Sequence, residues 1–214
     1  MSAVPDPHRR AHWAFFRQWL KNPLAVAAVS PSSPQLARQM IAALPAGSQR
    51  VIELGGGTGA ITQALLDAGI PPSALMVLEL GEVMHQTLRR RFPAVNLHLA
   101  DAVDVRRLAV ESGFLDEAPA DAVVSGLGLL STPRSVQLAI LGESFACMRP
   151  GGRFVQFTYG PASPVAREVL DELGLDARRT SFTWWNVPPA SVYVYQRLQS
   201  RGIPARPMAT RAAG

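Results

Sequence analysis

The stretch VIELGGGTGAITQAL, residues 51–65, constrains the fold most, because it places four glycines in the five positions 55–59. The apolar residues before the glycines predict a β-strand beginning around Arg50, and the helical spacing of apolar residues after them predicts an α-helix. Glycine loses more conformational freedom on folding than any other residue, so the cluster needs a steric or ligand-binding reason. A tight strand-to-helix turn needs one or two glycines. We therefore expect a loop that presents free N–H groups at the start of a helix to a ligand.

Strand-like and helix-like patterns alternate through the rest of the chain. Strands are expected at 74–80, 95–101 and 153–160, and another within 120–130, where it runs into a loop. Helices are expected at 34–43, 82–92, 135–148 and 164–174, and a closing pair of strands at 180–187 and 190–198. Alternation of this kind predicts an α/β fold, with a mostly parallel sheet covered by helices on both faces.

Size and composition limit the alternatives. The 214 residues suit one α/β domain, and the formal charge of +5 indicates an anionic partner such as nucleic acid, acidic lipid or an anionic cofactor. The single cysteine, Cys147, excludes an internal disulfide and suits a reducing compartment. There is no signal-peptide pattern and no run of about 20 apolar residues, so we expect a soluble or peripheral protein rather than an integral one.

The glycine loop fits two ligand classes. Gly55, Gly57 and Ala60 match the dinucleotide-binding fingerprint, and Glu79 stands about 20 residues further on, where a ribose-binding acid is expected. The same stretch also reads Glu53-x-Gly55-x-Gly57-x-Gly59, which resembles motif I of S-adenosylmethionine-dependent methyltransferases. Both classes use an acid such as Glu79 on the ribose hydroxyls.

Two further stretches favour the methyltransferase over the dehydrogenase. Asp101-Ala102 resembles the acidic pair that meets the adenine ring in that superfamily, and the stretch 148–152, MRPGG, resembles its L-K-P-G-G turn. The resemblance implies S-adenosylmethionine as cofactor, with Glu53 near its cationic end, S-adenosylhomocysteine as product, and no metal. The implied cofactor-binding residues are Glu53, Gly55, Gly57, Thr58, Gly59, Glu79, Leu80, Asp101, Ala102 and Ser125.

The segment after the fourth strand indicates the kind of methyl acceptor. Enzymes that methylate the amino groups of nucleic-acid bases typically carry Asn or Asp, two prolines and an aromatic residue there. This chain has VVSGLGLLSTP instead, with three leucines at 127, 129 and 130, of which at least one is expected in the core. A site without those groups is poorly suited to a flat polar base, so no nucleic-acid partner is expected.

Residues 8–21 predict an amphipathic helix. At about 100° per residue, its aromatic residues share one face and its cations lie beside it. This pattern is typical of a helix in a membrane interface, with cations on anionic headgroups, although a helix packed on its own domain shows a similar one. The residues expected to contact the membrane are Arg10, Trp13, Phe16, Arg17, Trp19, Leu20 and Lys21.

With these motifs together, the chain resembles the bacterial phospholipid N-methyltransferases, which are related to the ribosomal RNA adenine dimethyltransferases. The resemblance rests on AVAAVSPSSPQLARQM, VIELGGGTGAIT, LELGEVMHQTLRRRFP, VVSGLGLLSTP, VQFTYGPASP and WNVPPASVYVYQR. Gly128 departs from it, because a proline is expected there, which affects the shape of that loop. The family implies a Rossmann-like class I fold with a seven-stranded, mostly parallel sheet.

The same resemblance implies successive methylation of phosphatidylethanolamine to phosphatidylcholine, at the cytoplasmic face of the inner membrane. The expected organisation is a membrane-associating segment at 1–33, a methyltransferase domain at 34–200 and a tail at 201–214. Tyr159, at the end of the fifth strand, is the candidate catalytic residue, because its ring and hydroxyl suit a methylated amine. Two alternatives stay open: an RNA or small-molecule methyltransferase, and a lipid-surface module that binds the cofactor without turnover.

Overall fold

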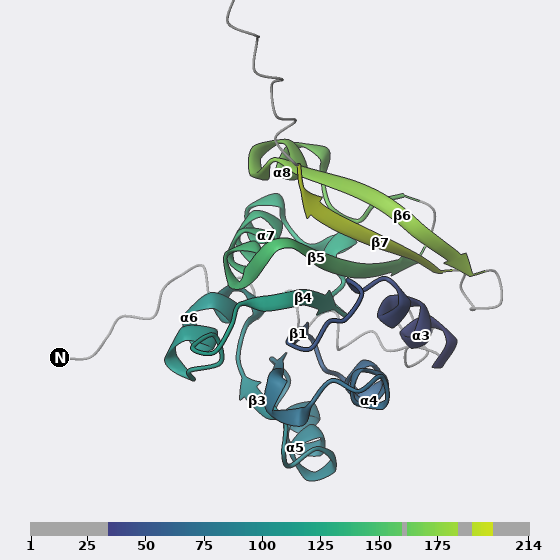
Figure 1. Ribbon diagram of the computed structural model, residues 1–214. Coiled ribbons are helices and arrows are strands. Elements are labelled where there is room, and N and C mark those ends of the chain that lie inside the picture. The colour runs from purple at the N-terminus through teal and green to yellow at the C-terminus, as the bar shows by residue number, and fades with distance from the viewer. Residues whose placement is uncertain (1–33, 160–161, 184–189, 199–214) are drawn as a thin grey trace, which may run out of the picture.

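The computed structural model describes residues 34–159, 162–183 and 190–198. Its centre is a seven-stranded sheet in the order β3-β2-β1-β4-β5-β7-β6 (Figure 1). The strands are β1 (Val51–Leu54), β2 (Leu75–Glu79), β3 (Asn96–Leu99), β4 (Ala120–Ser125), β5 (Met148–Tyr159), β6 (Leu175–Thr183) and β7 (Ala190–Arg197). The first five strands pair in parallel, and β7 runs antiparallel to both β5 and β6. The expected Rossmann-like methyltransferase fold is confirmed.

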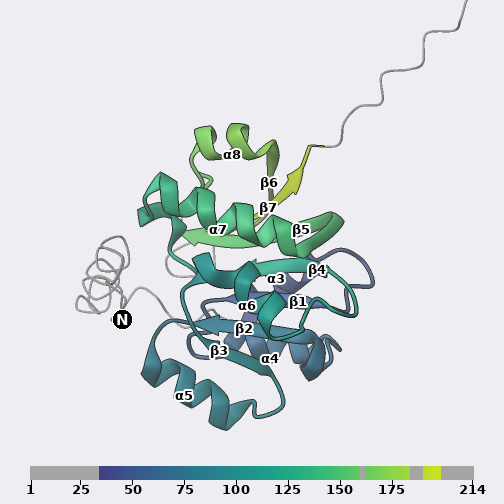
Figure 2. The same ribbon diagram turned by 90° about the vertical axis from the view of Figure 1, so that its left-hand side faces the viewer.

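Helices cover both faces of this sheet (Figures 1 and 2). They are α3 (Pro34–Ala42), α4 (Ala60–Asp67), α5 (Glu82–Arg91), α6 (Val105–Glu111), α7 (Arg134–Cys147) and α8 (Arg167–Leu173), with short 3₁₀ turns at Pro72–Ala74, Ala102–Asp104 and Leu129–Ser131. Because both faces are covered, β1 and β2 are buried along their whole length, which explains why they are apolar except for Glu53 and Glu79. No helix in these described ranges has the length and apolar character needed to cross a membrane.

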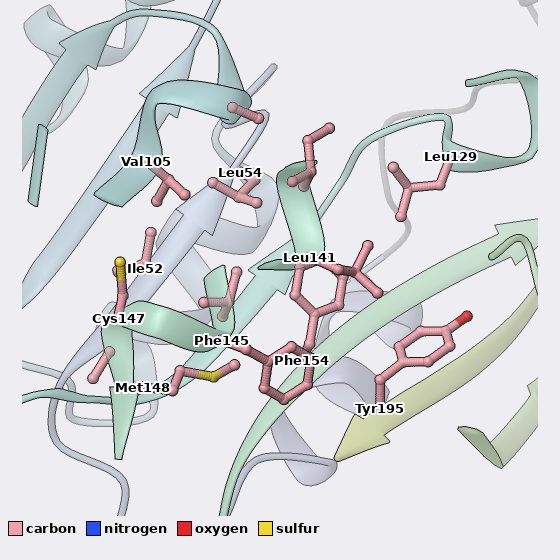
Figure 3. Packing of buried hydrophobic residues seen from close by; sticks show 14 of the residues in the cluster. Ile52, Leu54, Val105, Leu129, Leu141, Phe145, Cys147, Met148, Phe154 and Tyr195 are labelled. Atoms are coloured by element: carbon pink, nitrogen blue, oxygen red, sulfur yellow. The ribbon is translucent and has the colours of Figure 1, made fainter. Parts of the chain in front are cut away.

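Two apolar clusters hold the layers together, one on each face of the sheet. Side chains from α6, α7 and α8 pack on one face, where the Phe154 ring of β5 packs against the rings of both Phe145 and Tyr195 (Figure 3). Side chains from α3, α4 and α5 pack on the other, with Leu36, Leu65 and Leu88 fully buried. Neighbouring residues of β1 alternate between the two clusters, so each β1 side chain has a fixed face.

Element boundaries differ from expectation in four places. The 3₁₀ turn and helix spanning 102–111 were not predicted, and the helix expected from 164 begins at Arg167. The strand expected at 180–187 is β6, which begins five residues earlier, at Leu175; residues 184–187 lie outside the described ranges. β5 begins at Met148, five residues earlier than expected, so the stretch 149–152 lies inside the strand. Its pairing with β4 shifts register between Ala120 and Ala122, which accommodates the proline and glycines without ending the strand.

Candidate active site

The carboxyl ends of the parallel strands meet at one edge of the sheet. Glu79 ends β2 opposite Leu99 of β3, and Ser125 ends β4 opposite Leu54 of β1. β1 is followed by α4 on one face of the sheet and β4 by α7 on the other, so the chain turns in opposite directions from two neighbouring strands. Open α/β sheets bind ligands outside the strand ends at such a point.

The glycine loop lies at this point, and its own packing requires most of its glycines. Gly55, Gly57 and Gly59 have φ of 77°, 50° and 80°, a region that other residues rarely adopt. A Cβ at Gly56 would lie 2.7 Å from Cγ1 of Val77. The expectation that the turn alone needs only one or two glycines was therefore wrong.

Gly57 is where the loop opens. A Cβ added there meets no atom nearer than the Gly55 carbonyl oxygen at 4.0 Å, whereas one at Gly59 would lie 2.6 Å from the Phe92 ring. Space on the Gly57 side is therefore free for a ligand, and the Gly57 position can accept a side chain only into that space.

Replacing Gly57 by alanine should separate ligand binding from folding. We expect a modest loss of stability from the positive φ, about 1 kcal/mol, but at least a tenfold loss of cofactor affinity in calorimetry, because the methyl group enters the ligand's space. Gly174→Ala is the matched control, since Gly174 has a similar φ of 61° and open surroundings away from this edge. Equal cofactor affinity in the two variants would contradict this placement of the ligand.

Glu79 lies beside the loop as a fixed acceptor. Its side chain is 6% exposed, Oε2 accepts a hydrogen bond from the Gly57 N–H at 2.8 Å, and Oε1 accepts one from the Gly81 N–H at 2.7 Å. A carboxylate oxygen has two lone pairs, so each oxygen keeps one for a hydroxyl donor. The geometry fits the expected contact with two ribose hydroxyls.

Loss of this carboxylate should weaken cofactor binding. Hydrogen bonds to charged groups contribute roughly 1.5–3 kcal/mol, so Glu79→Ala should raise the dissociation constant for S-adenosylmethionine by about 10- to 150-fold. Calorimetry on protein whose circular dichroism matches the wild type would measure it. Unchanged affinity would exclude Glu79 from the binding site.

Glu53 is fully buried between β1 and α4. Its Oε2 accepts a hydrogen bond from the Thr62 hydroxyl at 2.7 Å, and its Oε1 has no partner in the described part of the chain. Burial raises the pKa of Glu53 to about 8, against a smaller lowering by the Thr62 hydrogen bond, and the nearby Glu79 charge raises it further. The carboxyl group is therefore mostly protonated at neutral pH, so it lacks the negative charge that would attract the cationic end of the cofactor, near which Glu53 was expected.

The remaining predicted cofactor contacts are spread along the same edge. The Asp101 side chain accepts a hydrogen bond from the Val103 N–H at 3.2 Å and caps the 3₁₀ turn that begins at the buried Ala102. Leu80 directly follows Glu79 and is partly exposed, and Thr58 is exposed at the tip of the glycine loop. The sheet register thus brings the ends of β1, β2 and β3 to one edge.

The loop after β4 contacts the glycine loop directly. A Cβ at Gly126 would lie 2.9 Å from the Gly55 carbonyl oxygen, and Cδ2 of Leu127 lies 2.9 Å from the Cβ position of Gly55. Ser125 is fully buried, and its Oγ accepts a hydrogen bond from the Leu127 N–H at 3.3 Å. Both loops therefore need a glycine where their backbones meet.

The three leucines of this loop differ in environment. Leu129 is buried, as expected for at least one of them, whereas Leu127 is partly buried and Leu130 is 64% exposed. Tyr159 stands at the end of the neighbouring strand β5, half-buried, with its ring edge-on to Phe157 at 5.6 Å. Burial raises the pKa of the Tyr159 hydroxyl, so this group stays protonated at neutral pH.

Two glutamines near this loop were missed by sequence reasoning. Gln156 of β5 is fully buried, and its Nε2 donates hydrogen bonds to the carbonyl oxygens of Leu127 at 2.8 Å and Phe157 at 2.6 Å. Gln137 of α7 is buried as well and bonds to several backbone groups. The only signal was a lone polar residue on an apolar face, which by itself indicates no role.

The residues expected to contact the membrane, 10–21, lie outside the described ranges.

Comparisons with known proteins agree with this geometry. A family model for a methyltransferase domain matches residues 51–152. An ornithine lipid N-methyltransferase of Singulisphaera acidiphila is 32% identical over 185 residues, which cover 84% of this chain and 92% of the relative. The solved structure of a TehB-like S-adenosylmethionine-dependent methyltransferase from Corynebacterium glutamicum has a TM-score of 0.57 at 18% identity, covering 88% of this chain and all of that one.

Magnesium protoporphyrin IX methyltransferase from Synechocystis, solved with bound S-adenosylmethionine, has a TM-score of 0.57 at 14% identity, covering 80% of this chain and 81% of that one. The sheet order, the glycine loop and the acidic end of β2 define a Rossmann-like methyltransferase. The chain belongs to the class I S-adenosylmethionine-dependent methyltransferases, and S-adenosylmethionine is its cofactor.

Proposed function

We propose that the protein is an N-methyltransferase of amino lipids, which methylates phosphatidylethanolamine successively to its monomethyl and dimethyl forms and to phosphatidylcholine. The observation that carries the proposal is the loop after β4. It contacts the glycine loop through Gly126 and Leu127, offers no amide or aromatic side chain to a base, and exposes Leu130. A site that places apolar side chains beside the cofactor loop suits an amine attached to acyl chains.

The relative from Singulisphaera supports an acceptor of this class, since it is an ornithine lipid N-methyltransferase and it matches along 92% of its length. That name also favours a second acceptor, an ornithine lipid. Both lipids present a primary amine close to a membrane surface, so the two candidates differ in headgroup and share the chemistry.

The enzyme's main task in this reaction is to position the amine nitrogen against the methyl group. S-adenosylmethionine supplies an electrophilic methyl group on a sulfonium, and the amine nitrogen must attack it in line with the breaking carbon–sulfur bond. An alkylamine with a pKa of about 10 is mostly protonated at neutral pH and must lose a proton before each attack. We infer that Tyr159 contacts the amine, because its protonated hydroxyl can accept a hydrogen bond and its ring face tolerates methylated nitrogen.

The cofactor side of the site follows from the same geometry. We infer that Glu79 holds the ribose hydroxyls, that the loop from Gly55 to Gly59 lies against the ribose and methionine portion, and that Asp101 and Ala102 meet the adenine. Leu80 and Ser125 complete this edge. In this arrangement the methyl group faces the loop after β4.

The membrane partner belongs to the same proposal. We infer that residues 8–21 hold the enzyme at an anionic surface on the cytoplasmic side, because a lipid amine stays in the interface while its acyl chains remain in the bilayer. No nucleic-acid partner is needed for this activity.

The test is methylation of defined vesicles. Purified protein and labelled S-adenosylmethionine are incubated with vesicles containing phosphatidylethanolamine, vesicles containing ornithine lipid, and unstructured RNA, and the products are separated by degree of methylation. Label in mono-, di- and trimethylated phosphatidylethanolamine is expected. Label in ornithine lipid alone would mean that ornithine lipid, and not phosphatidylethanolamine, is the acceptor. Label in RNA would overturn the lipid assignment. Cofactor binding without transfer to any acceptor would favour a non-catalytic module.

A further inference from the structure

Gln137, in the first turn of α7, makes an unusual set of hydrogen bonds for one side chain. It is 4% exposed, and its Nε2 lies 2.8 Å from the Leu129 carbonyl oxygen, 3.2 Å from that of Thr132 and 3.1 Å from that of Pro164. Its Oε1 accepts a hydrogen bond from the Ala166 N–H at 2.9 Å. The side chain thus bonds to four backbone groups from two separate segments.

The two segments follow the carboxyl ends of neighbouring strands. Leu129 and Thr132 belong to the loop after β4, and Pro164 and Ala166 belong to the segment between β5 and α8. The proposed acceptor contacts adjoin these connections, with Leu130 in the first and Tyr159 at the end of β5, before the second. Gln137 therefore ties together the two chain segments that follow the strands beside the proposed acceptor contacts.

The cofactor side is held by other groups. Gln156 fixes the Leu127 carbonyl next to the glycine loop, and Glu79 fixes the Gly57 N–H. Within the ranges that the structure describes, the Gln137 side chain makes no hydrogen bond to the glycine loop, β2 or the turn at Asp101. Loss of the Gln137 amide should leave the cofactor contacts in place.

We propose that Gln137 is a positioning residue for the methyl acceptor, which sets the spacing between the loop after β4 and the segment after β5. This inference rests on the proposed function, because it assumes that the acceptor amine enters between those segments. The amide is well suited to the task, since its two N–H groups serve carbonyls of both segments while its oxygen serves an N–H of the second. A side chain of the same size without the amide would leave these buried groups unpaired, and the segments would rearrange to reach water.

The experiment compares Gln137→Leu with Leu141→Ala on full-length protein. Leu141 is fully buried on the same helix, and its apolar side chain makes core contacts but no hydrogen bond, so its truncation destabilises the fold while the Gln137 hydrogen bonds stay in place. Kinetics are measured on phosphatidylethanolamine vesicles, ornithine lipid vesicles or both, with product distribution, cofactor affinity and melting temperature. Gln137→Leu should lower kcat/KM for the lipid at least tenfold and change the ratio of methylated products, with cofactor affinity within about twofold of wild type.

Leu141→Ala should show a comparable fall in melting temperature with the wild-type product ratio. Unchanged lipid kinetics in Gln137→Leu, or a loss of cofactor affinity as large as the loss of kcat/KM, would overturn the inference. If Gln137→Leu does not fold, Gln137→Glu serves instead: its carboxylate cannot donate to the carbonyls, so its rate relative to wild type should rise as pH falls and the group gains a proton. A pH-independent ratio would then count against the inference.

Hydrogen exchange separates this inference from the proposed function. Gln137→Leu should speed exchange of the Ala166 amide and of the amides at 129–132 together, while those of the glycine loop keep wild-type rates. If wild-type protein methylates neither lipid, the proposed function fails. Coupled exchange of the two segments would still show that Gln137 holds them, whereas exchange confined to one segment would contradict that.

Discussion

Between pH 5 and pH 8 the wild-type protein should lose stability as pH rises, and Glu53→Gln should lose much less. The pKa of Glu53 is raised from 4.5 to about 8 by burial. In the folded state the carboxyl therefore keeps its proton through this range, while in the unfolded chain it releases it. The folded state binds more protons, so the free energy of unfolding falls by about 1.4 kcal/mol per pH unit for this group, and levels off above pH 8.

The two pKa values are about 3.5 apart, which corresponds to roughly 5 kcal/mol lost between pH 4.5 and pH 8. Urea unfolding at several pH values measures it. Glutamine cannot ionise, so its variant should lack this slope, whereas Glu82→Gln, which changes an exposed acid on α5, should keep it. If Glu53→Gln keeps the wild-type slope, Glu53 is ionised in the folded protein and its role beside a cationic group is restored.

The architecture was predictable because apolar runs and their interruptions decide it. β1 and β2 are apolar except for Glu53 and Glu79, and the helix at 82–92 ends before Pro93, as expected. The helix α6 was missed because Val105–Glu111 is short and its arginines obscure the apolar period. The early start of β5 was missed because Pro150 and two glycines normally end a strand, whereas here the Arg149 side chain pairs with Asp121 and holds that segment against β4.

The site was predictable where a residue's place in a strand fixes its position. Glu79 ends β2, so parallel pairing brings it to the glycine loop wherever the helices lie. The state of Glu53 depends instead on contacts that no local pattern encodes. Its environment requires Thr62 on α4 and the apolar packing on that face of the sheet. The reason for Gly56 was hidden likewise, since Val77 and Leu88, which exclude a Cβ there, come from β2 and α5.

Removal of residues 1–21 should abolish lipid methylation and vesicle binding while leaving S-adenosylmethionine binding nearly unchanged. The reason is the sequence of the segment: Trp13, Phe16 and Trp19 would otherwise form an apolar patch in water. In a bilayer interface, Arg10, Arg17 and Lys21 should each contribute about 1 kcal/mol on an anionic surface. Binding of the full chain should therefore rise with phosphatidylglycerol content and fall with added salt.

A variant with all three cations changed to glutamine keeps the aromatic face and serves as the control. This variant should still bind vesicles through its aromatic face, but its binding should lose most of the dependence on salt. Its dissociation constant for the cofactor should equal that of the full chain. The truncation leaves the glycine loop and Glu79 intact, so the cofactor contacts described above remain. Weaker cofactor binding after truncation would therefore mean that the segment covers the cofactor. Full-rate methylation of bilayer phosphatidylethanolamine by the truncated protein would contradict the membrane-helix proposal. The site at the carboxyl ends of the strands would then bind the lipid amine without help from residues 1–21.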